Sequence, residues 1–330
     1  MVLKARVGSG TGVEVLIAAA AVADADWRAI FSHGEDALAA VRTAGGTGLV
    51  KDVARFGRFG WINLAGPLTQ QGSDWSHQAL LAMVGALEPE ELRAVLVGSR
   101  RHQLHRRLDE AVVRQALDGD RAAVRRFRAT LDDTLLQVSP WLMRTPAVTI
   151  QQLCLDTLAA ILPASAKAPD ASTARRRLKD VGATRLLEEV APGVHYGPQV
   201  LDDVVLVTSP QVAPILVVVD EVDRTVILHP PLGDEGATDA GAQLRDLGRA
   251  VGDATRLRLL QELRTGARTL VDLTTALDSP RTTLLHHLAL LRSAGLIEIA
   301  VVDGEPNVYT LRTDGFERLA QAAKGFPLSS

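Results

Sequence analysis

The sequence is poor in the residues that build cross-links and soft-metal sites. Its 330 residues include a single cysteine, Cys154, which excludes an internal disulfide and any cysteine-cluster metal centre. Aromatic residues make up only 4% of the chain. Long apolar runs are lacking too. The segment Val13–Val22 is apolar, but Asp24 and Asp26 follow it, so it is too short to cross a membrane and predicts a core helix.

The chain also lacks a strong excess of basic residues. Its 36 Lys and Arg residues are outnumbered by 39 Asp and Glu residues, which gives a formal net charge of −3. A nucleic-acid-binding protein of this charge is expected to bind DNA non-specifically with modest affinity and to depend on local geometry. The N-terminus has no basic segment followed by an apolar core and a cleavage site. We therefore expect a cytoplasmic protein with no membrane partner.

Motifs that carry catalysis or bind cofactors are missing as well. The glycine-rich segments Gly8–Gly12 and Gly45–Gly48 resemble phosphate loops, but no Lys-Ser/Thr pair follows either one and neither completes a dinucleotide fingerprint. Both are interpreted as turns. Cys154 lies on an apolar helix face and is predicted to be a buried thiol. The sequence predicts no enzymatic activity, no catalytic residue and no cofactor.

One histidine pair has the spacing of a metal site. His102 and His105 are three residues apart on a predicted helix and could place two ligands on one face. Four arginines flank them and would repel a cation: Arg100, Arg101, Arg106 and Arg107. Solvated helix residues are the favoured interpretation, and no metal site is predicted.

The region from residue 244 to residue 311 carries the most information. Asp253 is a candidate N-cap for a helix with Leu257, Leu260 and Leu263 on its apolar stripe. A second helix is predicted at about Thr269–Leu277. The segment Asp278–Pro280 then interrupts the helical pattern. Within it, Ser279 and Pro280 are favourable as the N-cap and first residue of a third helix. That helix is expected to run to about Ser293.

A β-hairpin is predicted after the third helix. Leu284, Leu288 and Leu291 share one face of that helix, and Gly295 ends it. The run Leu296–Val302 and the run Val308–Leu311 then flank an Asp303-Gly304 turn. Helices followed by such a hairpin predict a winged helix-turn-helix.

Four segments of this region resemble the ArsR-type bacterial transcriptional regulators. They are residues 253–260 (DATRLRLL), 282–288 (TTLLHHL), 291–296 (LRSAGL) and 308–311 (VYTL), in the family's order and spacing. The resemblance implies sequence-specific binding to double-stranded DNA, as a repressor more often than an activator. It also implies a homodimer formed through the first and last helices of the domain, here near Gln243–Val251 and Asp314–Lys324.

The third helix is the predicted recognition helix, whose N-terminal residues meet base edges in the major groove. Arg281 can bond guanine bidentately, and Leu285 can touch a thymine methyl or cover a neighbouring helix. The wing tip at residues 304–307 is acidic and would repel phosphate, so wing contacts are not expected. The candidate DNA-binding residues are Arg281, Leu285 and His286 for bases, Thr282 and Thr283 for bases or phosphates, and Arg256 and Arg292 for phosphates.

Metal sensing, the best-known mode of these regulators, does not fit this chain. Relatives that sense soft metals carry a cysteine pair on the second helix, but Thr269–Leu277 has none. Others use His and Asp on the last helix, but Thr313–Lys324 has no histidine. The regulator is therefore predicted to be independent of metals.

The remaining residues form a separate N-terminal domain. A small, polar, aperiodic linker, Gly233–Gly241, divides the chain into domains 1–235 and 241–330. Helices are predicted over most of residues 13–187. Strands are predicted at Val204–Val207, Ile215–Asp220 and Thr225–His229, the last two as a hairpin. The predicted fold is mainly α with a small β-unit (α+β): a helical N-terminal domain and a C-terminal winged helix-turn-helix.

The role of the N-terminal domain is left open by the sequence. It holds all four tryptophans, Trp27, Trp61, Trp75 and Trp141, which suit either a small-molecule pocket or a core. It is interpreted as an effector-sensing or assembly domain, with a small organic ligand as the candidate effector. Two other interpretations remain: an enzyme with an accessory winged helix, and a protein-interaction module whose winged helix has lost its affinity for DNA.

Overall fold

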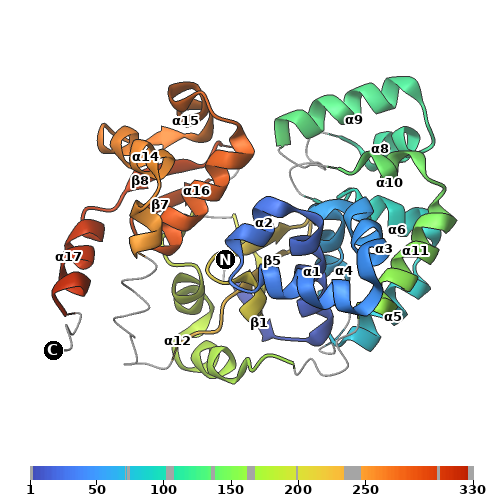
Figure 1. Ribbon diagram of the computed structural model, residues 1–330, viewed down its shortest axis with the longest axis horizontal. Coiled ribbons are helices and arrows are strands. Elements are labelled where there is room, and N and C mark those ends of the chain that lie inside the picture. The colour runs from blue at the N-terminus through green and yellow to red at the C-terminus, as the bar shows by residue number, and fades with distance from the viewer. Residues whose placement is uncertain are drawn as a thin grey trace.

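The computed structural model describes residues 3–325 except 71, 73–74, 102–107, 135–137, 162–167, 198–199, 234–246 and 303–304. The fold is mainly α-helical with a small β part, as predicted, and its described strands form two four-stranded sheets (Figure 1). No helix among the described residues is long and apolar enough to cross a membrane.

The N-terminal domain is built on a mixed sheet with the strand order β1-β3-β5-β4. The strands are β1 (Lys4–Gly8), β3 (Asp203–Thr208), β5 (Thr225–His229) and β4 (Val217–Asp220). The predicted β4–β5 hairpin is confirmed, with Val219 opposite Val226 in antiparallel register. Strand β1 was not predicted. It pairs in parallel with β3, whose sequence position is so distant that no local turn signal announces the pairing.

Helices cover this sheet and enclose the main core (Figure 1). Helix α1 (Thr11–Ala23) contains the apolar run Val13–Val22, and most of its side chains are buried, as expected of a core helix. The other helices are α2 (Ala25–Ile30), α3 (Gly34–Asn63), α4 (Ala65–Gln70), α5 (His77–Ala86), α6 (Pro89–Leu96), α8 (Glu110–Leu117), α9 (Arg121–Thr134), α10 (Pro140–Arg144), α11 (Ala147–Ala160) and α12 (Ser172–Val190), with a 3-10 turn, η1 (Pro210–Val212).

Two of the four tryptophans lie within the main core, and Trp27 and Trp141 are partly buried against it. Trp61 is fully buried and its indole N–H donates to the Val53 carbonyl over 2.9 Å. Trp75 is also buried and packs against Gly8, Gly10 and Gly12. A Cβ atom added at any of these glycines would clash with Trp75 or the Ser76 backbone. The segment Gly8–Gly12 is therefore a tightly packed strand-to-helix turn, as predicted, and Cys154 is a buried thiol.

The C-terminal unit has its own core. It comprises α14 (Ala254–Arg264), β6 (Arg268–Thr269), α15 (Leu270–Leu277), α16 (Arg281–Ser293), β7 (Ile297–Val301), β8 (Val308–Leu311) and α17 (Gly315–Gly325). Asp253 caps α14 as predicted, accepting from the backbone N–H of Arg256. The predicted apolar stripe of α14 is wrong at Leu257, which is 45% exposed, because the helix buries Leu259 beside Leu260 and Leu263 instead.

The sheet of the C-terminal unit contains a strand that precedes the predicted linker. Strand β2 (Val194–Tyr196) pairs in parallel with β7, which gives the order β2-β7-β8-β6. Two backbone hydrogen bonds extend the pairing, from Ile299 to Gly193 and from Gly197 to Val301. We call residues 192–197 the strap. The strap packs as part of the C-terminal sheet even though it lies before Gly233 in the chain.

Candidate nucleic-acid interface

Local signals fix the ends of α15 and the turn that follows. The side chain of Thr269 accepts from the backbone N–H of Asp272, and the Asp272 carboxylate accepts from the Thr269 N–H over 2.8 Å. This reciprocal pair is a capping box. The helix ends at Asp278, whose left-handed φ of 49° is a conformation that aspartate tolerates better than most residues. The chain therefore turns sharply into α16.

The start of α16 differs by one residue from the prediction. Pro280 occupies the N-cap position and no side chain caps the helix. The Ser279 hydroxyl donates to the Leu277 carbonyl over 3.3 Å instead of capping α16. The helix nevertheless runs to Ser293 and ends before Gly295, which has a φ of 70°, as predicted.

Helix α16 faces the C-terminal core with the predicted side. Leu284, Leu288 and Leu291 are buried there. The helical period then directs residues 282, 286, 289 and 293 away from that core. At the N-terminal end Arg281 is partly exposed and Thr283 is exposed. Leu285 is half-buried, and the side chain of Thr282 lies outside the described atoms.

Comparison with known proteins agrees with this geometry. A family model described as a helix-turn-helix domain matches residues 251–300, which span α14, α15, α16 and most of β7. These residues form a helix-turn-helix domain. No curated protein matches the chain. The β7–β8 pair that follows α16 has the place of a wing, although residues 303–304 of its turn lie outside the described residues.

Arg256 is engaged within the helix-turn-helix domain. Its Nε donates to the Ala250 carbonyl over 2.8 Å, and its Nη2 donates to the Arg249 carbonyl over 2.6 Å. Its Nη1 lies 3.2 Å from Nδ1 of His287. These bonds hold the helical residues 247–251 against α14. Arg256 therefore has a structural role here, and part of its donor capacity is already used.

Arg292 is not at the protein surface. It is 6% exposed, and its Nη1 donates to the Pro192 carbonyl in the strap over 2.9 Å. Burial lowers its pKa to about 10. The expected phosphate contact of Arg292 does not fit this arrangement, because the strap covers the end of α16. The sequence held no signal for this contact, since the two residues are 100 positions apart.

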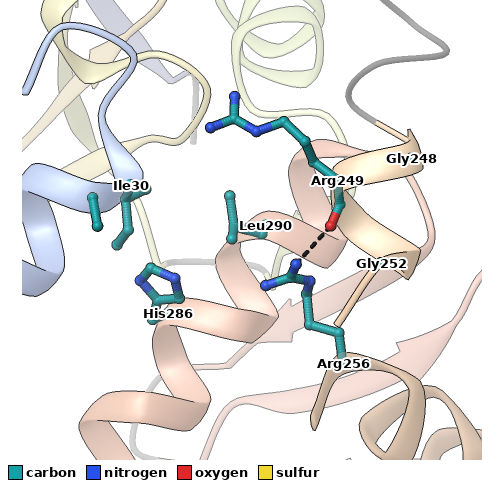
Figure 2. Close-up of a pocket in the computed structure, with 8 residues that line it drawn as sticks. Ile30, Gly248, Arg249, Gly252, Arg256, His286 and Leu290 are labelled. Carbon is teal, nitrogen blue, oxygen red and sulfur yellow. Dashed lines mark hydrogen bonds between the residues drawn. The ribbon is translucent and has the colours of Figure 1, made fainter. Parts of the chain in front are cut away.

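Part of the outward face of α16 lies against the N-terminal domain. Ala289 and Leu290 pack on the main core of that domain. His286 and Leu290 face Ile30 of α2 across a cavity of about 530 Å³ (Figure 2). The Nδ1 of His286 is buried and has no hydrogen-bond partner among the described residues. The side of α16 expected to read bases is thus partly occupied.

Burial and neighbouring charges lower the pKa of His286 and so favour its neutral form. Burial is the main cause of its lowered pKa, followed by the neighbouring His287 and Arg256. Asp26 and Asp253 act in the opposite direction but do not outweigh these effects. A neutral ring can donate from one nitrogen and accept at the other. His286 therefore offers hydrogen-bonding capacity without a fixed positive charge.

Within the described part of the chain, no group of three or more His, Cys, Asp or Glu side chains is arranged to hold a metal ion. His102 and His105, the pair singled out by the sequence, lie outside the described residues. In the wing, Glu305 is exposed, and its charge is unfavourable near phosphate. Metal independence and the lack of wing contacts remain predictions.

Proposed function

We propose that this protein is a sequence-specific, metal-independent transcriptional regulator, acting as a repressor, that reads the major groove with α16. The observation that supports this best is the helix-turn-helix geometry itself. The leucines of α16 anchor it in the core while Arg281 and Thr283 stay accessible at its N-terminal end. A guanidinium at this position can bond both acceptors of a guanine edge.

The proposed regulator is a homodimer. Operators with two half-sites are read by paired recognition helices about one helical turn apart. Helix α17 lies at the far end of the helix-turn-helix domain from α2 (Figure 1), and its Phe316 side chain is 42% exposed. An exposed phenylalanine on a terminal helix suits a subunit interface, which agrees with the family resemblance. Analytical ultracentrifugation of the wild type and Phe316→Ser tests this assembly.

The N-terminal domain controls DNA access in this proposal. The major groove is about 12 Å wide and admits a single helix. Helix α16 cannot enter it while Ala289 and Leu290 pack on the N-terminal core. The arrangement described here is therefore the form that does not bind DNA. Separation of α16 from the N-terminal domain produces the binding form, and the ratio of the two forms sets the apparent affinity.

A fluorescence-anisotropy titration tests the proposal. The full chain is titrated against labelled promoter fragments of its own and neighbouring genes and against a shuffled duplex, at one fixed salt concentration. We expect at least one promoter to bind about 1000-fold more tightly than the shuffled duplex, the lower end of specific regulators.

An Ala29→Lys variant, designed to separate α2 from α16, is titrated in parallel. Equal affinity for every duplex in both proteins, or no binding by either, would favour the protein-interaction module instead. In the wild type, α16 packs on the N-terminal domain, and we call this the closed arrangement. Ala29→Lys shows whether a wild-type protein that fails to bind DNA is merely closed or cannot bind DNA at all.

A further inference from the structure

We infer that the cavity between α2 and the helix-turn-helix domain is a binding site for a small organic carboxylate. The cavity measures about 530 Å³, within the range of ordinary small-molecule sites. Both domains contribute to its wall. The lining residues are Ala29, Ile30, Gly248, Arg249, Gly252, Arg256, His286 and Leu290.

One side of the cavity is cationic. Arg249 is exposed, and its guanidinium takes part in none of the ion pairs found between described residues. Figure 2 shows this side chain extending toward the N-terminal domain, away from the backbone carbonyl that Arg256 contacts. Arg256 adds a second positive charge, and its contacts with Ala250, Arg249 and His287 leave some of the five N–H groups of its guanidinium available. Paired guanidiniums favour a carboxylate.

The opposite side of the cavity is apolar. Ile30 is buried in α2, and Leu290 projects from α16 between Ile30 and Arg249 (Figure 2). His286 lies beside Ile30, with its Nδ1 buried and unpartnered among the described residues. A compact inorganic anion would leave this side empty. A carboxylate attached to a small hydrocarbon body satisfies both sides, and it can also give His286 a hydrogen-bond partner.

Such a ligand would bind the closed arrangement preferentially. Ala29 and Ile30 belong to the N-terminal domain, whereas Arg256 and His286 belong to the helix-turn-helix domain and Arg249 lies directly before it, held by the bond from Arg256 to its carbonyl. When the domains separate, the cavity loses one of its walls. A ligand shifts an equilibrium toward the state that it binds more tightly. This step rests on the proposed function: the carboxylate weakens operator binding by holding α16 against the N-terminal domain.

Calorimetric titration of the full chain tests the site without DNA. The probes are acetate, benzoate and 1-naphthoate, with benzamide as the uncharged match of benzoate and inorganic phosphate as the anion without an apolar body. We expect saturable binding at one site per chain, affinity rising from acetate to 1-naphthoate, and benzamide at least tenfold weaker than benzoate.

Two arginine variants locate the site. Arg249→Gln removes the guanidinium of Arg249 and should weaken benzoate binding at least tenfold. Arg258→Gln is the matched control, because Arg258 is exposed on α14 and does not line the cavity, and it should leave benzoate binding unchanged. The inference is overturned if no carboxylate binds, if both variants lose affinity equally, or if phosphate binds as tightly as benzoate.

The regulatory step has a separate readout. Saturating 1-naphthoate should lower operator affinity in the wild type but not in Arg249→Gln. Carboxylate binding with unchanged operator affinity overturns the regulatory step and leaves the site standing. Failure of both wild type and Ala29→Lys to bind any promoter overturns the proposed function, whereas the calorimetric result still decides the site.

Discussion

The guanidinium of Arg292 donates a hydrogen bond to the carbonyl oxygen of Pro192 across 2.9 Å. This bond joins the end of α16 to the strap, whose β2 strand pairs with β7. Helix α16 is therefore held at its C-terminal end by the strap while its middle lies against the N-terminal domain. We expect the helix-turn-helix domain and the strap to move together when α16 leaves the N-terminal domain.

Arg292→Ala should destabilise the protein. The substitution removes a buried guanidinium and leaves the Pro192 carbonyl without its partner, which typically costs about 1–3 kcal/mol. Urea unfolding curves of the full chain measure the loss. Arg264→Ala is the control, because Arg264 is exposed at the end of α14 and its removal should cost less than about 0.5 kcal/mol. Equal losses would contradict a structural role for Arg292.

Arg281→Ala should weaken specific DNA binding. Loss of a bidentate base contact costs about 1–3 kcal/mol of discrimination. We expect a fall of this size on the promoter that the wild type prefers and a much smaller fall on shuffled DNA, both measured by anisotropy. The exposed Arg258 provides a control variant, Arg258→Ala. If Arg281→Ala reduces binding to both duplexes equally, Arg281 contacts phosphate and not a base.

Ala29→Lys should raise operator affinity. Ala29 is exposed on α2 and lines the cavity that also holds Arg249 and Arg256. A lysine there adds bulk and repulsion between like charges, which favours separation of the domains. Anisotropy with the preferred promoter should show a several-fold tighter complex.

Ala25→Lys is the matched control for this opening. It places the same charge at an exposed position of the same helix, and Ala25 does not line the cavity. If operator affinity rises equally in Ala29→Lys and Ala25→Lys, the increase comes from non-specific attraction to phosphate. If operator affinity rises in neither variant, the contact between α16 and the N-terminal domain does not limit DNA binding.

Glu14→Gln should stabilise the protein at high pH. Burial raises the pKa of Glu14 from 4.5 to about 7. The folded state therefore binds this proton more tightly than the unfolded state. The free energy of unfolding should fall as pH rises from about 4.5 to about 7 and level off above that.

The neutral amide of glutamine removes this pH dependence. At pH 8 the free energy of unfolding of Glu14→Gln should exceed that of the wild type by at most about 3 kcal/mol, and this difference should narrow toward pH 5. Urea unfolding at pH 5, 7 and 8 measures it. Glu91→Gln, at an exposed position of α6, is the control, and its free energy of unfolding should match that of the wild type at every pH. A pH-independent difference for Glu14→Gln would show that the carboxyl does not titrate in this range.

Transition metals should not alter DNA binding. No described cluster offers three or more ligands of the usual types, and soft metals need thiolates that a chain with one buried cysteine cannot gather. Operator titrations with zinc, with cadmium and with a chelator should coincide. A metal that binds in a 1:1 ratio and shifts operator affinity would refute this prediction, and the His102–His105 pair would then be the first place to look.

The sequence by itself determined the elements that depend on neighbouring residues. The Asp253 cap, the leucine spacing of α16 and the end of that helix before Gly295 are set by contacts within a few turns. The β4–β5 hairpin is equally local, since four residues join its strands. These signals were sufficient to predict the helix-turn-helix and its outward face.

Tertiary structure alone decided where that face lies. Strand β1 pairs with β3 across most of the N-terminal domain, and Pro192 meets Arg292 across 100 positions. Leu290 and Ile30 come together from opposite ends of the chain to line one cavity. Contacts of this kind leave no periodicity and no turn signal, because each partner only needs a surface that fits the other. The sequence could therefore predict a recognition helix, whereas only the packing of the two domains could show that part of its outward face is covered.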